Sequence, residues 1–71
     1  MTIRDLIDSL TIQGAFRVYW WDYENNDAVI LAEGHDFESD NYNIKPRILG
    51  KRIAYMYAVD GVQNIEIEWR N

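Results

Sequence analysis

The chain has 71 residues, no cysteine, one histidine and a formal net charge of −5, and 48% of its residues are hydrophobic. This length predicts one small domain over residues 1–71 with room for a modest core, and the absence of cysteine excludes disulfides and thiol catalysis. The single histidine argues against structural zinc, and the acidic balance disfavours direct nucleic-acid binding, which depends on Lys and Arg.

The N-terminal residues predict an amphipathic helix. Thr2 can cap its first turn, and Asp5 stands three residues later, where a capping box places an acidic or amide side chain. Gly14 marks a break after the helix. A helix this short has to pack on an apolar surface to be stable. Its apolar residues at helical spacing are Ile3, Leu6, Ile7 and Leu10.

A first β-hairpin is predicted where two apolar runs, 16–23 and 28–33, flank Asn25-Asn26. Asparagine tolerates positive φ, which suits a type I′ turn. A two-residue loop would pair Glu24 with Asp27, and a four-residue loop would pair Tyr23 with Ala28, so both give one register. That register predicts one face with Phe16, Val18, Trp20, Val29 and Leu31, and a second face with Tyr19, Trp21, Tyr23 and Ile30.

A second hairpin is predicted around Asp60-Gly61, a strong type I′ signal between the runs 52–59 and 62–70. A two-residue turn pairs Val59 with Val62, whereas a three-residue loop would slip the register by one and exchange the faces. The two-residue turn places Ala54, Met56, Ala58, Ile65, Ile67 and Trp69 on one face. The opposite face then carries Ile53, Tyr55, Tyr57, Asn64, Glu66 and Glu68.

The segment 34–51 reads as a loop with one helical turn at 46–49, held to the core by Ile44, Ile48 and Leu49. The predicted fold class is therefore α+β, with one N-terminal helix packed on a four-stranded antiparallel sheet made of two β-hairpins. The predicted core contains Ile3, Leu6, Ile7, Leu10, Phe16, Val18, Trp20, Val29, Leu31, Met56, Ile65, Ile67 and Trp69.

Charge is segregated along the chain. Four bases and no acid occupy 45–52, and seven acids without any Lys or Arg occupy 22–40. Two solvated loops of opposite sign would explain this, and so would an acidic edge that faces a basic partner. The acidic surface consists of Asp22, Glu24, Asp27, Glu33, Asp36, Glu38 and Asp40.

No catalytic, cofactor-binding or metal-binding residue is predicted, and we do not expect an enzyme. His35-Asp36 is the one adjacent histidine–acid pair, but neither Ser9 nor Ser39 has the context of a nucleophile. The alternating acids at 36, 38 and 40 resemble the start of a calcium loop. That loop would need Gly and Glu where Asn41 and Arg47 stand.

Five segments together carry a resemblance to known proteins. They are Thr2–Ile7, Val18–Asp22, Ile30–Gly34, Ile48–Ile53 and Ile65–Glu68. In this order they resemble the small uncharacterised proteins of phages, prophages and gut Firmicutes. The resemblance implies an accessory gene product of unknown role, without catalytic residues to transfer.

The leading functional hypothesis is a non-enzymatic protein-interaction module that associates with itself, since one short helix covers only one sheet face. The segment 34–51 could instead close over the second face as a lid. The alternative function is an acidic nucleic-acid mimic that inhibits a host or defence nuclease. Short apolar runs and charges within residues 1–10 predict a cytoplasmic protein without a membrane span or secretory leader. The predicted interaction surface is Tyr19, Trp21, Tyr23, Ile30, Tyr55 and Tyr57.

Overall fold

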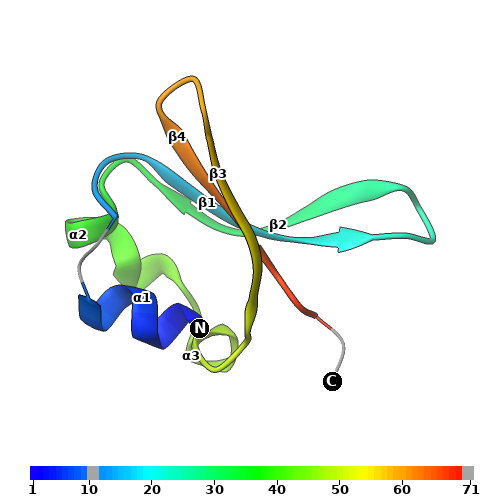
Figure 1. Ribbon diagram of the computed structural model, residues 1–71, viewed down its shortest axis with the longest axis horizontal. Coiled ribbons are helices and arrows are strands. Elements are labelled where there is room, and N and C mark those ends of the chain that lie inside the picture. The colour runs from blue at the N-terminus through cyan, green and yellow to red at the C-terminus, as the bar shows by residue number, and fades with distance from the viewer. Residues whose placement is uncertain (10–11, 70–71) are drawn as a thin grey trace.

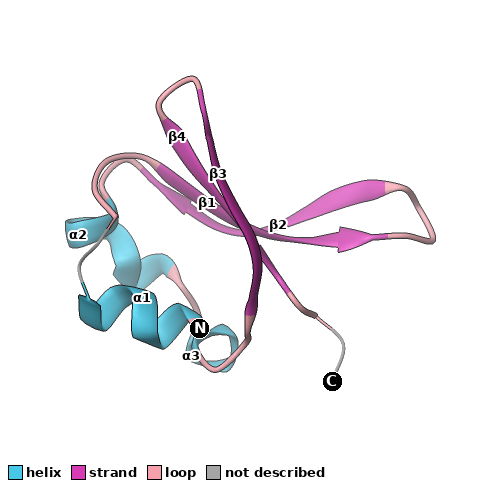
Figure 2. Cartoon of the chain, in the orientation of Figure 1, coloured by secondary structure: helices cyan, strands magenta, loops and turns pink. Residues whose placement is uncertain are grey.

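The computed structural model describes residues 1–9 and 12–69, and in them helices and a sheet form two layers (Figures 1 and 2). The four strands form one sheet in the order β2-β1-β4-β3. The helical segments lie together on one side of it, so the predicted α+β class is confirmed. The elements are α1 (Ile3–Ser9), β1 (Phe16–Asp22), β2 (Asp27–Gly34), α2 (Phe37–Asp40), the 3₁₀ helix η1 (Asn41–Asn43), α3 (Pro46–Leu49), β3 (Ile53–Val59) and β4 (Val62–Ile67).

The sheet is mixed, so the prediction of an antiparallel sheet made only of two hairpins is wrong. β1 pairs with β2 and β3 pairs with β4 in antiparallel fashion, but β1 runs parallel to β4 at the centre. The connection through α2, η1 and α3 leads from one edge strand, β2, to the other edge strand, β3. β4 therefore returns beside β1 in the same direction. Alternating hydrophobicity is the same in parallel and antiparallel strands, and it cannot specify how two hairpins join.

The predicted capping of α1 is confirmed. The Thr2 amide donates to Asp5 Oδ2 at 3.0 Å, and the Asp5 amide donates to Thr2 Oγ1 at 3.2 Å. The bond from the Thr2 amide holds the pKa of Asp5 below its ordinary value, because it favours the charged carboxylate. Ile3 and Leu6 are buried and Ile7 packs beside them, whereas Leu10 lies outside the described residues.

The first hairpin has a different register from the predicted one. Asp22 pairs with Asp27, so the turn contains the four residues 23–26. The Asp22 carboxylate accepts bonds from the amides of Glu24 and Asn25, and this local network ends the strand early. Asn26 has a φ of 52°, as expected for asparagine in a turn. Further along, Leu31 is an extra residue in β2, which shifts the register between Val18 and Tyr19.

The second hairpin follows the predicted two-residue turn. Val59 pairs with Val62, and both turn residues have positive φ, 51° at Asp60 and 79° at Gly61. Paired side chains share a face, so the predicted faces are confirmed along the outer part of the hairpin. Near the helices the register shifts between Ile53 and Tyr55, and Ile53 pairs with Ile67. Ile53 therefore packs against the core rather than lying on the second face.

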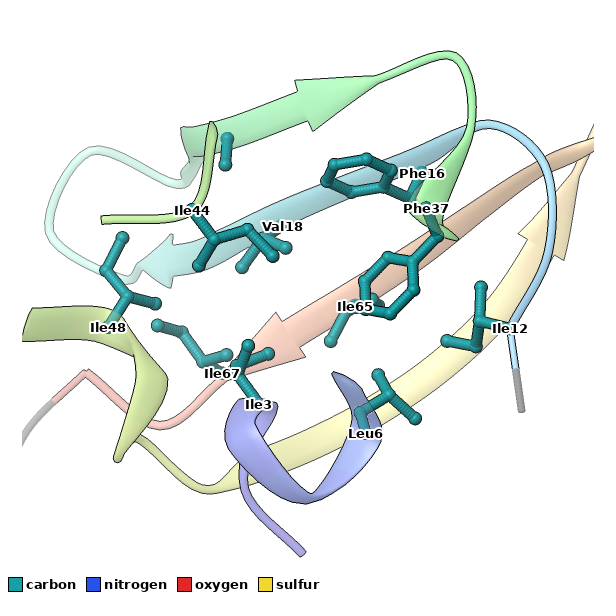
Figure 3. Packing of buried hydrophobic residues seen from close by; sticks show 11 residues of the cluster. Ile3, Leu6, Ile12, Phe16, Val18, Phe37, Ile44, Ile48, Ile65 and Ile67 are labelled. Carbon is teal, nitrogen blue, oxygen red and sulfur yellow. The ribbon is translucent and has the colours of Figure 1, made fainter. Parts of the chain in front are cut away.

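The core lies between the helices and one sheet face, and Figure 3 shows how its side chains converge. Of the predicted core residues, Ile3, Leu6, Phe16, Val18, Ile65 and Ile67 are buried, and Ile7, Trp20, Leu31 and Trp69 pack partly buried against them. The assignment of Val29 and Met56 to the core is wrong, because both are more than a third exposed. They lie on the two edge strands, beyond the reach of the helical layer.

The connecting segment supplies the part of the core that the hairpin patterns do not. Phe37 is fully buried and meets the Phe16 ring edge-on, with the ring centroids 5.1 Å apart. Ile44 and Ile48 are buried as predicted, and the predicted helical turn at 46–49 is α3. Because this segment packs in the same layer as α1, the alternative in which it forms a lid over the second face is wrong. Among the described residues, no helix is long and apolar enough to cross a membrane.

Candidate functional site

The second sheet face, turned away from the helices, brings most of the predicted interaction surface together. Ile30 pairs with Tyr19, Tyr19 pairs with Glu66, and Glu66 pairs with Tyr55, so these four side chains form one row across the sheet. Tyr57 lies two residues along β3 from Tyr55 and shares its face. We call the set Tyr19, Ile30, Tyr55, Tyr57 and Glu66 the aromatic face.

A hydrogen-bonded cluster lies at the middle of the aromatic face. The Tyr19 hydroxyl donates to Glu66 Oε1 at 3.0 Å and is bonded to the Tyr57 hydroxyl at 2.8 Å. A phenol has one proton, so Tyr57 is the donor to Tyr19. The Tyr19 side chain thus reaches across β4 and links the two hairpins.

Burial raises the pKa of Tyr19 well above the ordinary value of a phenol. The hydrogen bonds to Tyr57 and Glu66 and the negative charge of Glu66 act in the same direction. Tyr19 itself is only 6% exposed and is therefore part of the structure beneath the surface. Its role is to hold Tyr57 and Glu66 in place, rather than to contact a partner directly.

The exposed part of the aromatic face lies mainly on β3. Tyr55 is 65% exposed, Tyr57 45% and Ile30 46%. A sheet holds these side chains at fixed spacing, and tyrosine is a residue type that interfaces favour. The face therefore has the composition of a contact surface.

Trp21 and Tyr23 lie away from this row, where the β1–β2 hairpin extends beyond the rest of the sheet (Figure 1). Their rings are 6.5 Å apart in an edge-to-face arrangement. Trp21 is partly buried, whereas Tyr23 belongs to the four-residue turn and is exposed. Four residues of the predicted interaction surface thus belong to the aromatic face, and Trp21 and Tyr23 form an aromatic pair further along the hairpin.

A cleft of about 480 Å³ opens where β1 and β4 diverge beyond their paired residues. Trp20 and Trp69 stack in it with centroids 5.5 Å apart, and the Arg47 guanidinium and the Lys51 ammonium lie 5.8 and 5.4 Å from the Trp69 ring. Aromatic rings beside carboxylates can accept a cationic group. Sequence patterns did not indicate this cleft, because it depends on the parallel pairing. Its lining is Trp20, Trp21, Asp22, Tyr23, Glu24, Ala54, Tyr55, Glu66, Ile67, Glu68 and Trp69.

The seven residues of the predicted acidic surface form two groups rather than one. Three belong to the β1–β2 turn and its flanks, at 22, 24 and 27, and four lie at 33–40, around the opposite end of β2. Several have local roles: Asp36 caps α2, Asp40 accepts the amides of His35 and Asp36, and Glu33 lies 3.6 Å from Arg17. The acids thus follow the two ends of a strand.

His35, the histidine of the one adjacent histidine–acid pair, lies beside a second cleft. This cleft is lined by residues of β1, β2, β4, η1 and their flanks, and none of those described lining residues is a serine. Ser39 donates instead to the Asp36 carboxylate at 3.2 Å. No group of three or more His, Cys, Asp or Glu within residues 1–9 and 12–69 is arranged to hold a metal ion.

The two edges of the sheet differ in how they are protected. β2, at one edge, carries Asp27 and Glu33 and contains the extra residue Leu31. β3, at the other edge, has the sequence Ile-Ala-Tyr-Met-Tyr-Ala-Val, without a charge or a proline. Charges, prolines and irregularities are the features by which proteins keep an edge from pairing with another chain. β3 has only the register shift near Ile53.

Comparison with known proteins gives no relative from which a role could be transferred. No family model, no curated protein and no solved structure matches this chain. The function must therefore be argued from the aromatic face and the edges of the sheet.

Proposed function

We propose that this protein is a non-enzymatic protein-interaction module that associates with a second copy of itself through the aromatic face. The observation that carries the proposal is the exposure of Tyr55, Tyr57 and Ile30 on the sheet face that the helices leave open. Soluble monomers rarely expose contiguous apolar patches of more than a few hundred Å². Contact with another chain at β3 would remove part of this surface from water.

The charge distribution favours a second copy as the partner. The acids at 22–27 and 33–40 flank the ends of β2, whereas the two exposed tyrosines of the aromatic face lie on β3, at the other edge. Glu66 is the one carboxylate of the aromatic face, and its hydrogen bond from Tyr19 partly offsets its charge. Two copies, each with a net charge of −5, can thus meet on this face without bringing their acidic segments together. A twofold contact also stabilises a short chain by mass action.

The alternative, an acidic mimic of nucleic acid, has weaker support. Such a mimic presents carboxylates along one continuous surface, as phosphates lie along a strand. Here the acids lie in two groups, and Asp36, Asp40 and Glu33 make local contacts. The predicted phage-type origin adds nothing that separates the two functions.

Light scattering of matched variants tests the proposal. Tyr55→Glu places a charge on the exposed aromatic face, and we expect it to weaken association by at least tenfold. Tyr42→Glu is the control, because Tyr42 is 78% exposed on η1, outside the aromatic face. A wild type that stays monomeric up to about 1 mM would refute self-association. A dissociation constant of that size corresponds to a binding free energy of only about −4 kcal/mol.

A further inference from the structure

Strand β3 is an open edge over most of its length. The Ile53 amide already donates to the Met1 carbonyl at 2.9 Å, and Thr2 bridges to Arg52, so the N-terminus covers the edge as far as Ile53. From Ala54 to Val59 every residue is exposed. An uncharged, exposed edge of this kind is a template for pairing with another strand.

The sequence of β3 is nearly palindromic about Met56. Tyrosines flank Met56, alanines flank the tyrosines, and the outermost residues are Ile53 and Val59, which are both β-branched. An antiparallel pair of identical strands related by a twofold axis places each residue opposite its mirror position. With Met56 on the axis, each tyrosine meets a tyrosine and each alanine meets an alanine over the open part of the strand.

The backbone directions agree with this register. Val59 and Val62 close a two-residue turn and form a hydrogen-bonded pair, and such pairs alternate along an antiparallel ladder. Tyr57 therefore directs its amide and carbonyl toward β4. Met56 and Ala58 direct theirs toward the open edge, where Met56 can bond to Met56 of a second copy.

The side chains also fit a second copy. On the aromatic face, Tyr55 would lie opposite Tyr57 of the second copy in a pair that exchanges no backbone hydrogen bonds. In pairs of this type the Cα atoms are about 4.5 Å apart and the side chains are closest. Tyr57 is already oriented by its bond to Tyr19. On the other face, Met56 is 41% exposed and would be covered by Met56 of the second copy.

We propose that β3 pairs edge to edge with β3 of a second copy, antiparallel and with Met56 on the twofold axis, to give one continuous eight-stranded sheet. This inference rests on the proposed self-association and specifies its geometry. It joins the two aromatic faces side by side, rather than stacking one on the other.

Disulfide trapping tests the register, and the natural chain has no cysteine to interfere. A disulfide needs Cα atoms about 4.4–6.8 Å apart. Met56→Cys should therefore cross-link to itself on mild oxidation. Ala54→Cys and Ala58→Cys should each stay unlinked alone, because each would lie about 13 Å from its own copy, four residues along a strand. Mixed together, these two variants should form the heterodimer.

Ile30→Cys is the control, because Ile30 is an exposed residue of the aromatic face but lies on the opposite edge strand. It should remain unlinked, and circular dichroism should confirm that each variant is folded. If Ile30→Cys cross-links and Met56→Cys does not, in a protein that is dimeric by light scattering, the edge pairing is overturned and self-association remains. A monomeric wild type would overturn both. Self-linking of Ala54→Cys would show a different register.

Discussion

Truncation of Phe37 is the sharpest test of how the core is built. Phe37 is fully buried, yet it comes from a connecting segment in which hydrophobic patterning predicted a loop. Phe37→Ala removes the ring that meets Phe16 edge-on, and a change of this kind costs about 3–5 kcal/mol. A domain of 71 residues has a free energy of unfolding of about 4–11 kcal/mol. We therefore expect the variant to lose much of its stability or to unfold.

Urea unfolding followed by tryptophan fluorescence measures this effect, at one fixed protein concentration because association adds to apparent stability. Phe37→Leu keeps an apolar side chain and should cost less, about 1.5 kcal/mol. Tyr42→Ala removes an exposed ring from the neighbouring η1 and should change stability by less than about 0.5 kcal/mol. If Phe37→Ala is as stable as Tyr42→Ala, the segment 37–49 does not belong to the core.

Three further predictions follow from single positions. Burial raises the pKa of Tyr19 in the folded state, so the neutral Tyr19 side chain contributes its full stability below pH ~10, and this contribution is lost as the pH rises above that. Tyr19→Phe should therefore reduce the loss of unfolding free energy that is measured at alkaline pH. Gly34→Ala should lower the free energy of unfolding in urea by about 1–3 kcal/mol, because the added Cβ would lie 2.7 Å from the Phe16 ring. Gly50→Ala should be nearly neutral, because a Cβ there meets nothing within 4 Å, and equal stability of the two variants would contradict the close packing at Gly34. Ile67→Ala, at a buried position of β4, should lower the thermal midpoint through a loss of about 2–5 kcal/mol, and an unchanged midpoint would be inconsistent with the helix-on-sheet core.

The local features of the chain could be predicted from its sequence. The reciprocal caps of Thr2 and Asp5 and the turn at Asp60-Gly61 depend on neighbouring residues, so short motifs specify them. The alternation along β4 likewise predicted that Ile65 and Ile67 are buried, because a central strand facing a helical layer has one apolar face.

The long-range features could not be predicted in this way. The parallel pairing of β1 with β4 depends on the path of segment 35–52, which no local pattern specifies. Leu31 is an extra residue in β2, and period-two counting cannot detect such a shift. Met56 has the alternation of a core residue, but it lies on an edge strand beyond the helices.

The aromatic face was predictable in composition but not in detail. The alternation placed Tyr19, Tyr55 and Tyr57 on one side, and the structure brings them together. The bond from Tyr19 to Tyr57 crosses β4, so it depends on the strand order, and this order also makes β3 an edge. The near-palindrome around Met56 is visible in the sequence, but its meaning depends on that edge position.

Amide hydrogen exchange of β3 at two protein concentrations shows whether two copies meet at this strand. If they do, the Met56 and Ala58 amides are protected at high concentration and lose this protection on dilution. The amides of β2, at the other edge, should exchange at the same rate at both concentrations. Rapid exchange of the Met56 and Ala58 amides at every concentration would rule out pairing of β3 with a second copy.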